Sequence, residues 1–261
     1  MNGAALDERP IVLEVIDASK SYYGVPAVSE MSLSVRQGET LAIIGPNGAG
    51  KSTFFGLIAG EHKSSSGRIV FDGTEITRWS ANRRARFGMS RTFQVARFFP
   101  SRTVRENLQL ARVGRTGRYR DIVRGFSWAA KADEDDVATV LDDLGLSHIE
   151  DSLAANLAQG DRKRLELAMA MVQRPKVLLL DEPTAGMSNE DCALTVDTLK
   201  RIRSADPALT IVMTGHDMEV LFSLAQRIVL MADGRKVIDG SPEEIASSEI
   251  ARRVYLGDAN E

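Results

Sequence analysis

The 261-residue sequence contains a single cysteine, three histidines and few aromatic residues, which make up 6% of the chain. One cysteine excludes a disulfide within the chain and fits a reducing cytosol. This residue, Cys192, follows two acidic residues at a predicted helix start, so a small helix residue is a better interpretation than a nucleophile. No apolar stretch reaches the roughly 20 residues of a membrane-spanning helix. The N-terminus lacks the basic start and apolar core of a signal peptide, so we expect a cytoplasmic protein.

Proline and glycine are too scarce for a disordered or fibrous chain, with 8 and 21 residues respectively. A hydrophobic fraction of 43% with 26% charged residues is typical of a globular protein. The length suffices for one large domain, or for one domain with an inserted lobe. The net charge of −3 argues against general affinity for nucleic acids.

Charge is distributed unevenly along the middle of the chain. Residues 83–124 contain twelve arginines and no lysine against two acidic residues, and residues 131–151 are predominantly acidic. Such runs usually form solvated faces. A basic stretch of this length could instead face phospholipid headgroups or an acidic partner.

Apolar runs separated by helical patterns predict an α/β fold. Short unbroken runs of this kind suit parallel strands buried on both faces, and they lie at residues 39–45, 176–183, 209–217 and 227–234. Residues 67–73 are predicted to form an edge strand with an Asp-Gly turn. Between about residues 95 and 155 a helical insert interrupts the core. Helix-end signals are Gly60, the pair Thr103 and Glu106, and Ser241-Pro242 with Glu244.

A phosphate-binding loop follows the first of these runs. The sequence GPNGAGKST satisfies G-x-x-x-x-G-K-[ST] between a predicted strand and a predicted helix. Its glycines let backbone amides turn toward phosphates at the positive end of the helix. We expect Lys51 to reach the β- and γ-phosphates and the Ser52 hydroxyl to ligate Mg²⁺. The predicted nucleotide-binding residues are Gly45, Pro46, Asn47, Gly48, Ala49, Gly50, Lys51, Ser52 and Thr53.

Two acidic residues and a histidine are predicted at the same sheet edge. Asp181 and Glu182 end the run VLLLDE, and adjacent side chains on a strand point to opposite faces. Asp181 can therefore hold Mg²⁺ through water, while Glu182 acts as the general base on the attacking water. His216 follows the next strand, and we expect it to contact the γ-phosphate or to orient the water.

These motifs, in this order, resemble the ATP-binding subunit of an ABC transporter over about residues 11–257. The resemblance implies a P-loop NTPase (RecA-like) core with an antiparallel β subdomain and an inserted helical subdomain. We expect the first part of the core with the β subdomain at residues 8–94, the helical subdomain at 95–154, the second part of the core at 155–240, and a short C-terminal helix and tail at 241–261.

The resemblance also implies roles that the residues alone do not. Tyr22 stands where the family stacks an aromatic ring on adenine, with Tyr23 as the alternative. Gln94 in RTFQ stands where a glutamine ligates Mg²⁺ and links the site to the membrane partner. LAQGD at 157–161 replaces the signature LSGGQ, which binds the γ-phosphate held by the other ATPase subunit. The residues expected at that second nucleotide are Ala158, Gln159 and Gly160.

Several departures from the family pattern carry information. Ala158 lacks the signature hydroxyl, and Gly215 stands where many members have glutamate. The D-loop of the family corresponds to AGMS at 185–188, where Ser188 replaces an aspartate. The chain resembles the ATPases of branched-chain amino-acid and urea importers in these motifs: LAxG, AGM after DEPT, RTFQ, HDM and the terminal VYLG. The lipopolysaccharide-export ATPase shares VYLG but usually carries a full LSGG, so it ranks lower.

The resemblance therefore implies an ATP- and Mg²⁺-dependent hydrolase that powers import of a small polar solute from the inner face of the cell membrane. It implies transmembrane permease subunits, a second ATPase subunit of the same or a different sequence, and indirectly a solute-binding protein. A soluble ABC ATPase acting on nucleic acid is the weaker alternative, because the chain has one cassette and no heptad run. Exchange of Arg83, Arg84 and Arg86 for Glu is expected to spare ATPase activity but to uncouple transport.

Overall fold

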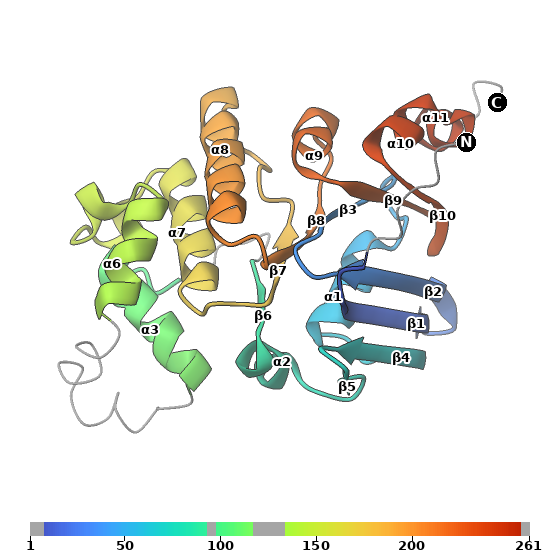
Figure 1. Cartoon of the computed structure of the whole chain (residues 1–261), viewed down its shortest axis with the longest axis horizontal. Helices are drawn as coiled ribbons and strands as arrows, with labels where there is room; N and C mark the ends of the chain where they lie inside the picture. Colours follow the sequence, from blue (N-terminus) through green and yellow to red (C-terminus); the bar gives the residue numbers. More distant parts are fainter. Residues whose placement is uncertain (1–7, 93–97, 117–133, 257–261) are drawn as a thin grey trace.

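The larger of two β-sheets forms the centre of the protein (Figure 1). The computed structural model describes residues 8–92, 98–116 and 134–256. The strand order in this sheet is β10-β9-β3-β8-β7-β6, and every neighbouring pair is parallel except β10 with β9. The strands are β3 (Thr40–Ile44), β6 (Met89–Arg91), β7 (Val177–Asp181), β8 (Thr210–Thr214), β9 (Arg227–Ala232) and β10 (Arg235–Gly240).

The smaller sheet is antiparallel and has the order β2-β1-β4-β5. Its strands are β1 (Ile11–Tyr22), β2 (Val25–Arg36), β4 (Ser66–Phe71) and β5 (Thr74–Glu75). The predicted Asp-Gly turn joins β4 to β5 with left-handed φ angles of 48° at Asp72 and 70° at Gly73. The prediction of β4 as an edge strand is wrong, because the two-residue β5 pairs outside it. A strand this short leaves no periodicity to detect in the sequence.

Helices pack against both sheets, and their capping predictions are confirmed. Thr103 and Glu106 exchange side-chain and backbone hydrogen bonds of 2.9 and 3.1 Å, and Ser241 and Glu244 form a second capping box. Gly60 caps its helix with a left-handed φ of 80°. The helices are α1 (Lys51–Ala59), α2 (Ala81–Phe87), α3 (Val104–Thr116), α6 (Glu134–Asp143), α7 (Gln159–Met171), α8 (Asn189–Ala205), α9 (Met218–Leu224), α10 (Pro242–Ser247) and α11 (Glu249–Leu256).

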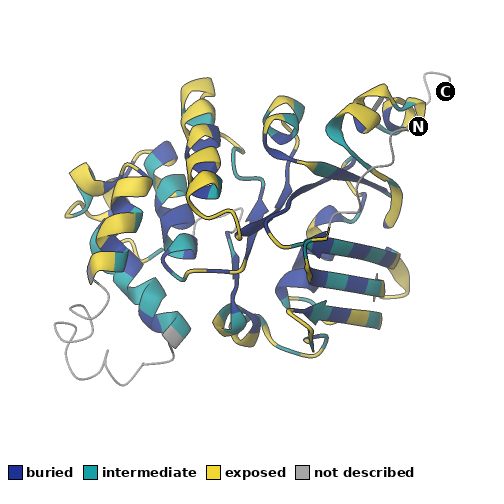
Figure 2. Cartoon of the chain, in the orientation of Figure 1, coloured by how far each residue is buried: buried dark blue, intermediate teal, exposed yellow. Residues whose placement is uncertain are grey.

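Strands β3, β7 and β8 are buried along their whole length, which confirms the prediction from their unbroken apolar runs (Figure 2). Alternate residues of each strand enter different hydrophobic clusters. Ile44 and Leu180 join the cluster that includes residues of α7 and α8, whereas Ile43 and Leu179 join the one that includes α1 and the smaller sheet. The central sheet is therefore covered on both faces, and ligands have access at its edges.

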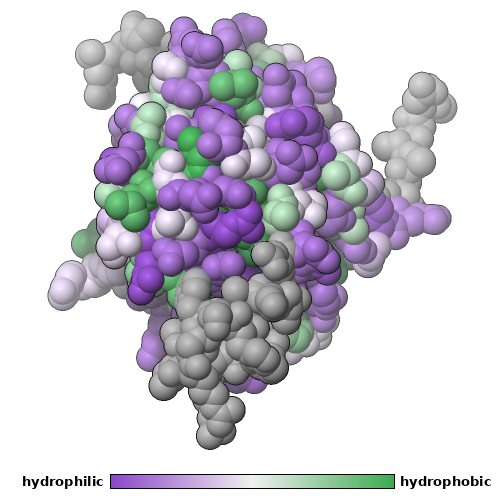
Figure 3. All heavy atoms as spheres, turned by 90° about the vertical axis from the view of Figure 1, so that its left-hand side faces the viewer, coloured by the Kyte–Doolittle hydropathy of each residue, from purple (hydrophilic) through white to green (hydrophobic). Residues whose placement is uncertain are grey.

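The side of the protein that carries α3 and α6 shows a mostly hydrophilic surface with scattered hydrophobic patches (Figure 3). Phe99 and Leu153 are among the exposed large apolar side chains, at 54% and 45% exposure. Within the described ranges, no helix combines the length and the apolar character needed to cross a membrane.

The predicted arginine run is not one continuous solvated surface. Arg83 is exposed and its guanidinium lies 3.7 Å from the centre of the Trp79 ring, but Arg84 is only 1% exposed. The Arg84 guanidinium donates hydrogen bonds of 2.6–3.1 Å to the carbonyls of Leu57, Ile58, Ile76 and Thr77. Glutamate at this position would bury a carboxylate among carbonyl oxygens. We therefore expect the Arg84→Glu part of the triple exchange to destabilise the fold, so the triple variant does not separate ATPase activity from coupling.

Candidate active site

A polar cleft of about 350 Å³ opens at the carboxyl edge of the parallel sheet. Strand β3 ends at Ile44 and α1 begins at Lys51, so the predicted phosphate loop runs directly from a buried strand into a helix start. The N-terminal end of α1 carries partial positive charge, which favours an anion in the cleft. The cleft is lined by Ala27, Asn47, Gly48, Ala49, Gly50, Lys51, Ser52, Thr53, Glu182 and His216.

Two positions of the loop admit only glycine. Gly50 has a left-handed φ of 91°, and a Cβ atom there would lie 2.3 Å from the carbonyl oxygen of Ala27. At Gly45 a Cβ atom would lie 2.1 Å from the carbonyl oxygen of Met231. Both distances are far below van der Waals contact. The loop can therefore approach β9 and β2 this closely only because Gly45 and Gly50 have no side chain.

Lys51 is 7% exposed and folds back onto its own loop. Its Nζ donates hydrogen bonds of 2.6 Å to the carbonyl of Gly45 and 2.9 Å to that of Pro46. Burial lowers the pKa of the Lys51 ammonium, while the carboxylates of Glu182 and Asp181 oppose the shift. A confined ammonium near the phosphate loop is therefore available to bind an anion.

Asp181 is 3% exposed, and both of its carboxylate oxygens have partners from the neighbouring strands. Oδ1 accepts a 2.7 Å hydrogen bond from Thr214 Oγ1 at the end of β8. Oδ2 pairs at 2.6 Å with Nη2 of Arg91 at the end of β6. Sequence reasoning identified neither partner, although Arg91 belongs to the RTFQ motif. The two strands on either side of β7 thus fix the orientation of the carboxylate.

Glu182 and His216, the two predicted catalytic residues, are in contact. Glu182 Oε1 lies 2.7 Å from His216 Nε2, and their side chains are 18% and 55% exposed. The backbone of Glu182 has a left-handed φ of 50°, and its N–H donates a 3.2 Å hydrogen bond to the carbonyl of Thr214. Since β7 ends at Asp181, strand alternation does not determine where Glu182 points. A sparsely populated backbone conformation does so instead.

The predicted signature turn begins α7 and packs against the D-loop of the same chain. Ala158 is the N-cap residue and makes no side-chain capping bond. A Cβ atom on Gly160 would lie 2.4 Å from Oδ1 of Asp191, and one on Gly186 would lie 2.9 Å from Nε2 of Gln159. The small residues therefore allow the close approach of the two segments.

Ser188, which departs from the family's aspartate, has a local task in this chain. It is the N-cap of α8, where its Oγ accepts a 3.2 Å hydrogen bond from the Asp191 N–H. The same hydroxyl donates a 2.8 Å bond to Asp191 Oδ2. Ser188 thus stabilises the start of α8, as serine does at many N-caps.

Tyr22 and Gln94 are the two remaining predicted site residues. Tyr22 is 36% exposed, and its ring meets that of His62 edge-on, with the ring centres 6.0 Å apart. Within the described part of the chain, the residues that line the cleft include neither Tyr22 nor Tyr23. Gln94 lies outside the described residues. The roles of Tyr22 and Gln94 stay predictions.

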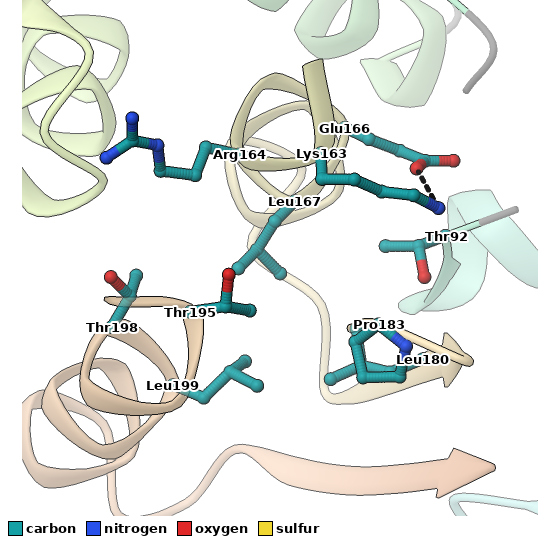
Figure 4. Close-up of a pocket in the computed structure, with 10 residues that line it drawn as sticks. All are labelled: Thr92, Lys163, Arg164, Glu166, Leu167, Leu180, Pro183, Thr195, Thr198 and Leu199. Atoms are coloured by element: carbon teal, nitrogen blue, oxygen red, sulfur yellow. Dashed lines mark ion pairs between the residues drawn. The ribbon is translucent and has the colours of Figure 1, made fainter. Parts of the chain in front are cut away.

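A second hollow lies between α7, α8 and the end of β7 (Figure 4). Thr92, Leu180 and Pro183 line the side nearest the sheet, and Lys163 forms a 3.5 Å ion pair with Glu166 above them. Its volume is about 20 Å³, which leaves room for about one water molecule. This hollow is too small to hold a ligand.

Comparison with known proteins agrees with the geometry. A profile described as "ABC transporter" matches residues 28–185. The chain is 35% identical to the high-affinity branched-chain amino acid transport ATP-binding protein LivG of Salmonella typhimurium, over 90% of this chain and 94% of that protein. It is 32% identical to the lipopolysaccharide export system ATP-binding protein LptB of Haemophilus influenzae, over 95% of this chain and 98% of that one.

A crystal structure of a nucleotide-free ATP-binding cassette from an ABC transporter superposes with a TM-score of 0.82 at 26% identity, covering 95% of this chain and all of that one. The predicted P-loop NTPase fold is therefore confirmed. Matches of this identity over nearly the whole length show the family as well as the fold. The chain belongs to the ABC transporter family, as an ATP-binding subunit that hydrolyses ATP.

Proposed function

We propose that this chain is the ATPase subunit of an importer for branched-chain amino acids or a related small amide such as urea. The observation that carries the proposal is the 35% identity with the Salmonella importer subunit over 90% of the chain. The unusual signature LAQGD and the AGM sequence after DEPT point to the same group of importers. A lipopolysaccharide-export role is the second candidate, because the Haemophilus relative is almost as similar, at 32%.

In this proposal the cleft at the sheet edge holds the triphosphate of ATP. The amides of residues 45–53 surround the β- and γ-phosphates. Lys51 exchanges its bonds to the loop carbonyls for bonds to phosphate oxygens, since its Nζ already lies in the loop. Tyr22 stacks on the adenine. This last role is inherited from the family. In this structure the Tyr22 ring instead contacts the ring of His62.

Glu182 is proposed as the general base. Its carboxylate lines the cleft and accepts the proton of the attacking water, while His216, 2.7 Å away, holds the carboxylate in place and reaches toward the γ-phosphate. The left-handed backbone at Glu182 aims the side chain at the cleft. Both residues stand on loops that follow adjacent buried strands, which keeps their spacing rigid.

The residues of the cleft also fit Mg²⁺. Magnesium prefers oxygen ligands and retains several waters, so it needs few side chains beyond the nucleotide phosphates. Ser52 offers a hydroxyl in the cleft and Asp181 a buried carboxylate, and among the described residues no cluster of three or more His, Cys, Asp and Glu competes for a metal. Gln94 is the third proposed ligand. The ion would supply charge neutralisation at the phosphates.

A second ATPase subunit, of the same or a different sequence, is proposed to complete the site. The start of α7 has an uncapped N-cap residue, Ala158, and first-turn amides of a helix have no partner within the helix. Together with Gln159 and Gly160 they would bind the γ-phosphate held by the partner's loop. Two such subunits would then close head-to-tail around two nucleotides.

Permease subunits are proposed to dock on the cytoplasmic side, at the cavity of about 220 Å³ between α2, the end of α1 and β6. Its walls include Ala81, Asn82, Glu61 and Arg91, and Arg91 lies three residues before Gln94. We infer that residues 95–154 act as a helical subdomain that moves against the core of residues 8–94 and 155–240. A solute-binding protein would act through the permease.

Uptake of labelled substrates tests the proposed function. Deletion of this chain in the organism that carries it should reduce uptake of leucine, isoleucine and valine, or of urea, to background. Wild-type protein should restore uptake and Lys51→Ala should not, because the ammonium at the phosphates is lost. Unchanged uptake of all four substrates would reject the proposal. Loss of lipopolysaccharide from the cell surface instead would establish the second candidate.

A further inference from the structure

Arg91 forms ion pairs with two carboxylates, one buried and one partly exposed. Its side chain is 11% exposed, and its guanidinium pairs with Asp181 Oδ2 at 2.6 Å and with Glu61 Oε2 at 2.5 Å. The guanidinium carbon also lies 5.4 Å from the centre of the Phe55 ring. Arg91 ends β6, directly beside β7, and this strand pairing delivers its side chain to Asp181.

The contact with Asp181 bears on metal binding. Asp181 Oδ1 accepts a hydrogen bond from Thr214 and Oδ2 accepts one from Arg91, whose charge offsets that of the carboxylate. A guanidinium beside a carboxylate weakens the attraction of that carboxylate for a second cation, and it repels the cation directly. Because the Asp181 side chain is only 4% exposed, solvent screens this effect little.

The contact of Arg91 with Glu61 lies at a surface cavity. Glu61 and Arg91 both line the cavity of about 220 Å³ beside α2, and the Glu61 side chain is 30% exposed. One guanidinium therefore pairs with a carboxylate at a surface cavity and with the buried carboxylate of Asp181, the residue before Glu182 of the nucleotide cleft. Any change in charge at Glu61 alters how strongly Arg91 is held by Asp181.

We propose that Arg91 is a positioning residue that divides its charge between Glu61 and Asp181 and thereby sets the affinity of the nucleotide site for Mg²⁺. This inference rests on the proposed function for the role of Asp181 at the metal and for a permease segment in the cavity. A partner anion near Arg91 draws the guanidinium away from Asp181 and favours the metal. A partner cation that occupies Glu61 has the opposite effect.

The test is equilibrium binding of a fluorescent ATP analogue while Mg²⁺ is titrated, in a Glu182→Gln background that prevents turnover. Glu61→Gln should raise the Mg²⁺ concentration at half-saturation about three- to tenfold, since the Glu61 carboxylate then no longer competes with Asp181 for the Arg91 guanidinium. Arg91→Met should lower it by a similar factor. Arg91→Lys retains the charge and should stay near the starting value, as should Glu75→Gln, which alters a surface carboxylate on β5.

We expect the Mg²⁺ concentration at half-saturation to shift in opposite directions in Glu61→Gln and Arg91→Met. A merely structural role for Arg91 would instead weaken nucleotide binding equally with and without Mg²⁺. Glu61→Gln leaves the Arg91–Asp181 pair intact, so it decides the question even if Arg91→Met does not fold. No shift in Glu61→Gln, or shifts of both variants in the same direction, would overturn the inference while the proposed function stands. Failure of the Glu182→Gln protein to bind the ATP analogue would overturn both the inference and the proposed function.

Discussion

Glu182→Gln is expected to lower the rate of ATP hydrolysis by at least about 100-fold while ATP binding persists. The amide cannot accept a proton from water, but it matches the carboxylate in size. It can also keep the 2.7 Å contact with His216, so the shape of the cleft is preserved. Phosphate release at saturating ATP measures the loss, and titration of ATP into the variant measures the retained binding.

The control for this prediction is another glutamate near the same sheet edge. Glu219 is exposed in the first turn of α9, and Glu219→Gln should hydrolyse ATP at the wild-type rate. Hydrolysis by Glu182→Gln close to that of the wild type would show that another group accepts the proton. Loss of ATP binding together with hydrolysis would show that Glu182 acts in binding instead.

Arg84→Met is expected to reduce the free energy of unfolding by about 3–5 kcal/mol, through loss of a buried charge that donates four hydrogen bonds from its two terminal nitrogens. The guanidinium satisfies the C-terminal carbonyls of α1, Leu57 and Ile58, together with those of Ile76 and Thr77. Burial lowers the pKa of Arg84 to about 10, so the side chain remains charged at neutral pH. Methionine fills part of the volume but leaves these oxygens without their donors.

Urea denaturation compares this variant with Arg83→Met, which removes an exposed arginine from the same helix. Arg83 stacks on Trp79 at 3.7 Å, and its loss should cost about 1 kcal/mol or less. Equal stabilities of the two variants would contradict the assigned difference. Comparison of Arg84→Met with Arg83→Met also shows which arginines of residues 83–124 are needed for folding. Only the exposed ones are suitable for tests of contact with the permease.

The phosphate loop and the buried strands could be predicted from the sequence because their signals are local. A glycine pattern between a strand and a helix determines its own geometry, as the contacts of Gly45 and Gly50 show. Unbroken apolar runs identified β3, β7 and β8 as buried strands, and capping residues located the start of α3 at Thr103 and Glu106.

The partners of Asp181 could not be predicted because they depend on sheet order. Arg91 and Thr214 lie far from Asp181 in the chain, and only the arrangement β8-β7-β6 brings them to its two oxygens. The orientation of Glu182 depends on a left-handed backbone that a non-glycine residue rarely adopts. The burial of Arg84 is likewise hidden in a sequence where its neighbours Arg83 and Arg86 are exposed.

Titration of ATP into the wild-type chain and Lys51→Ala tests the central claim, that the cleft between the phosphate loop and Glu182 is the ATP site. We expect one ATP per wild-type chain and affinity about 100-fold weaker in the variant, since a confined ammonium is lost from the phosphates. A matching melting temperature would show that the variant is folded. ATP binding of equal strength by both proteins, or none by the wild type, would show that this cleft is not the ATP site.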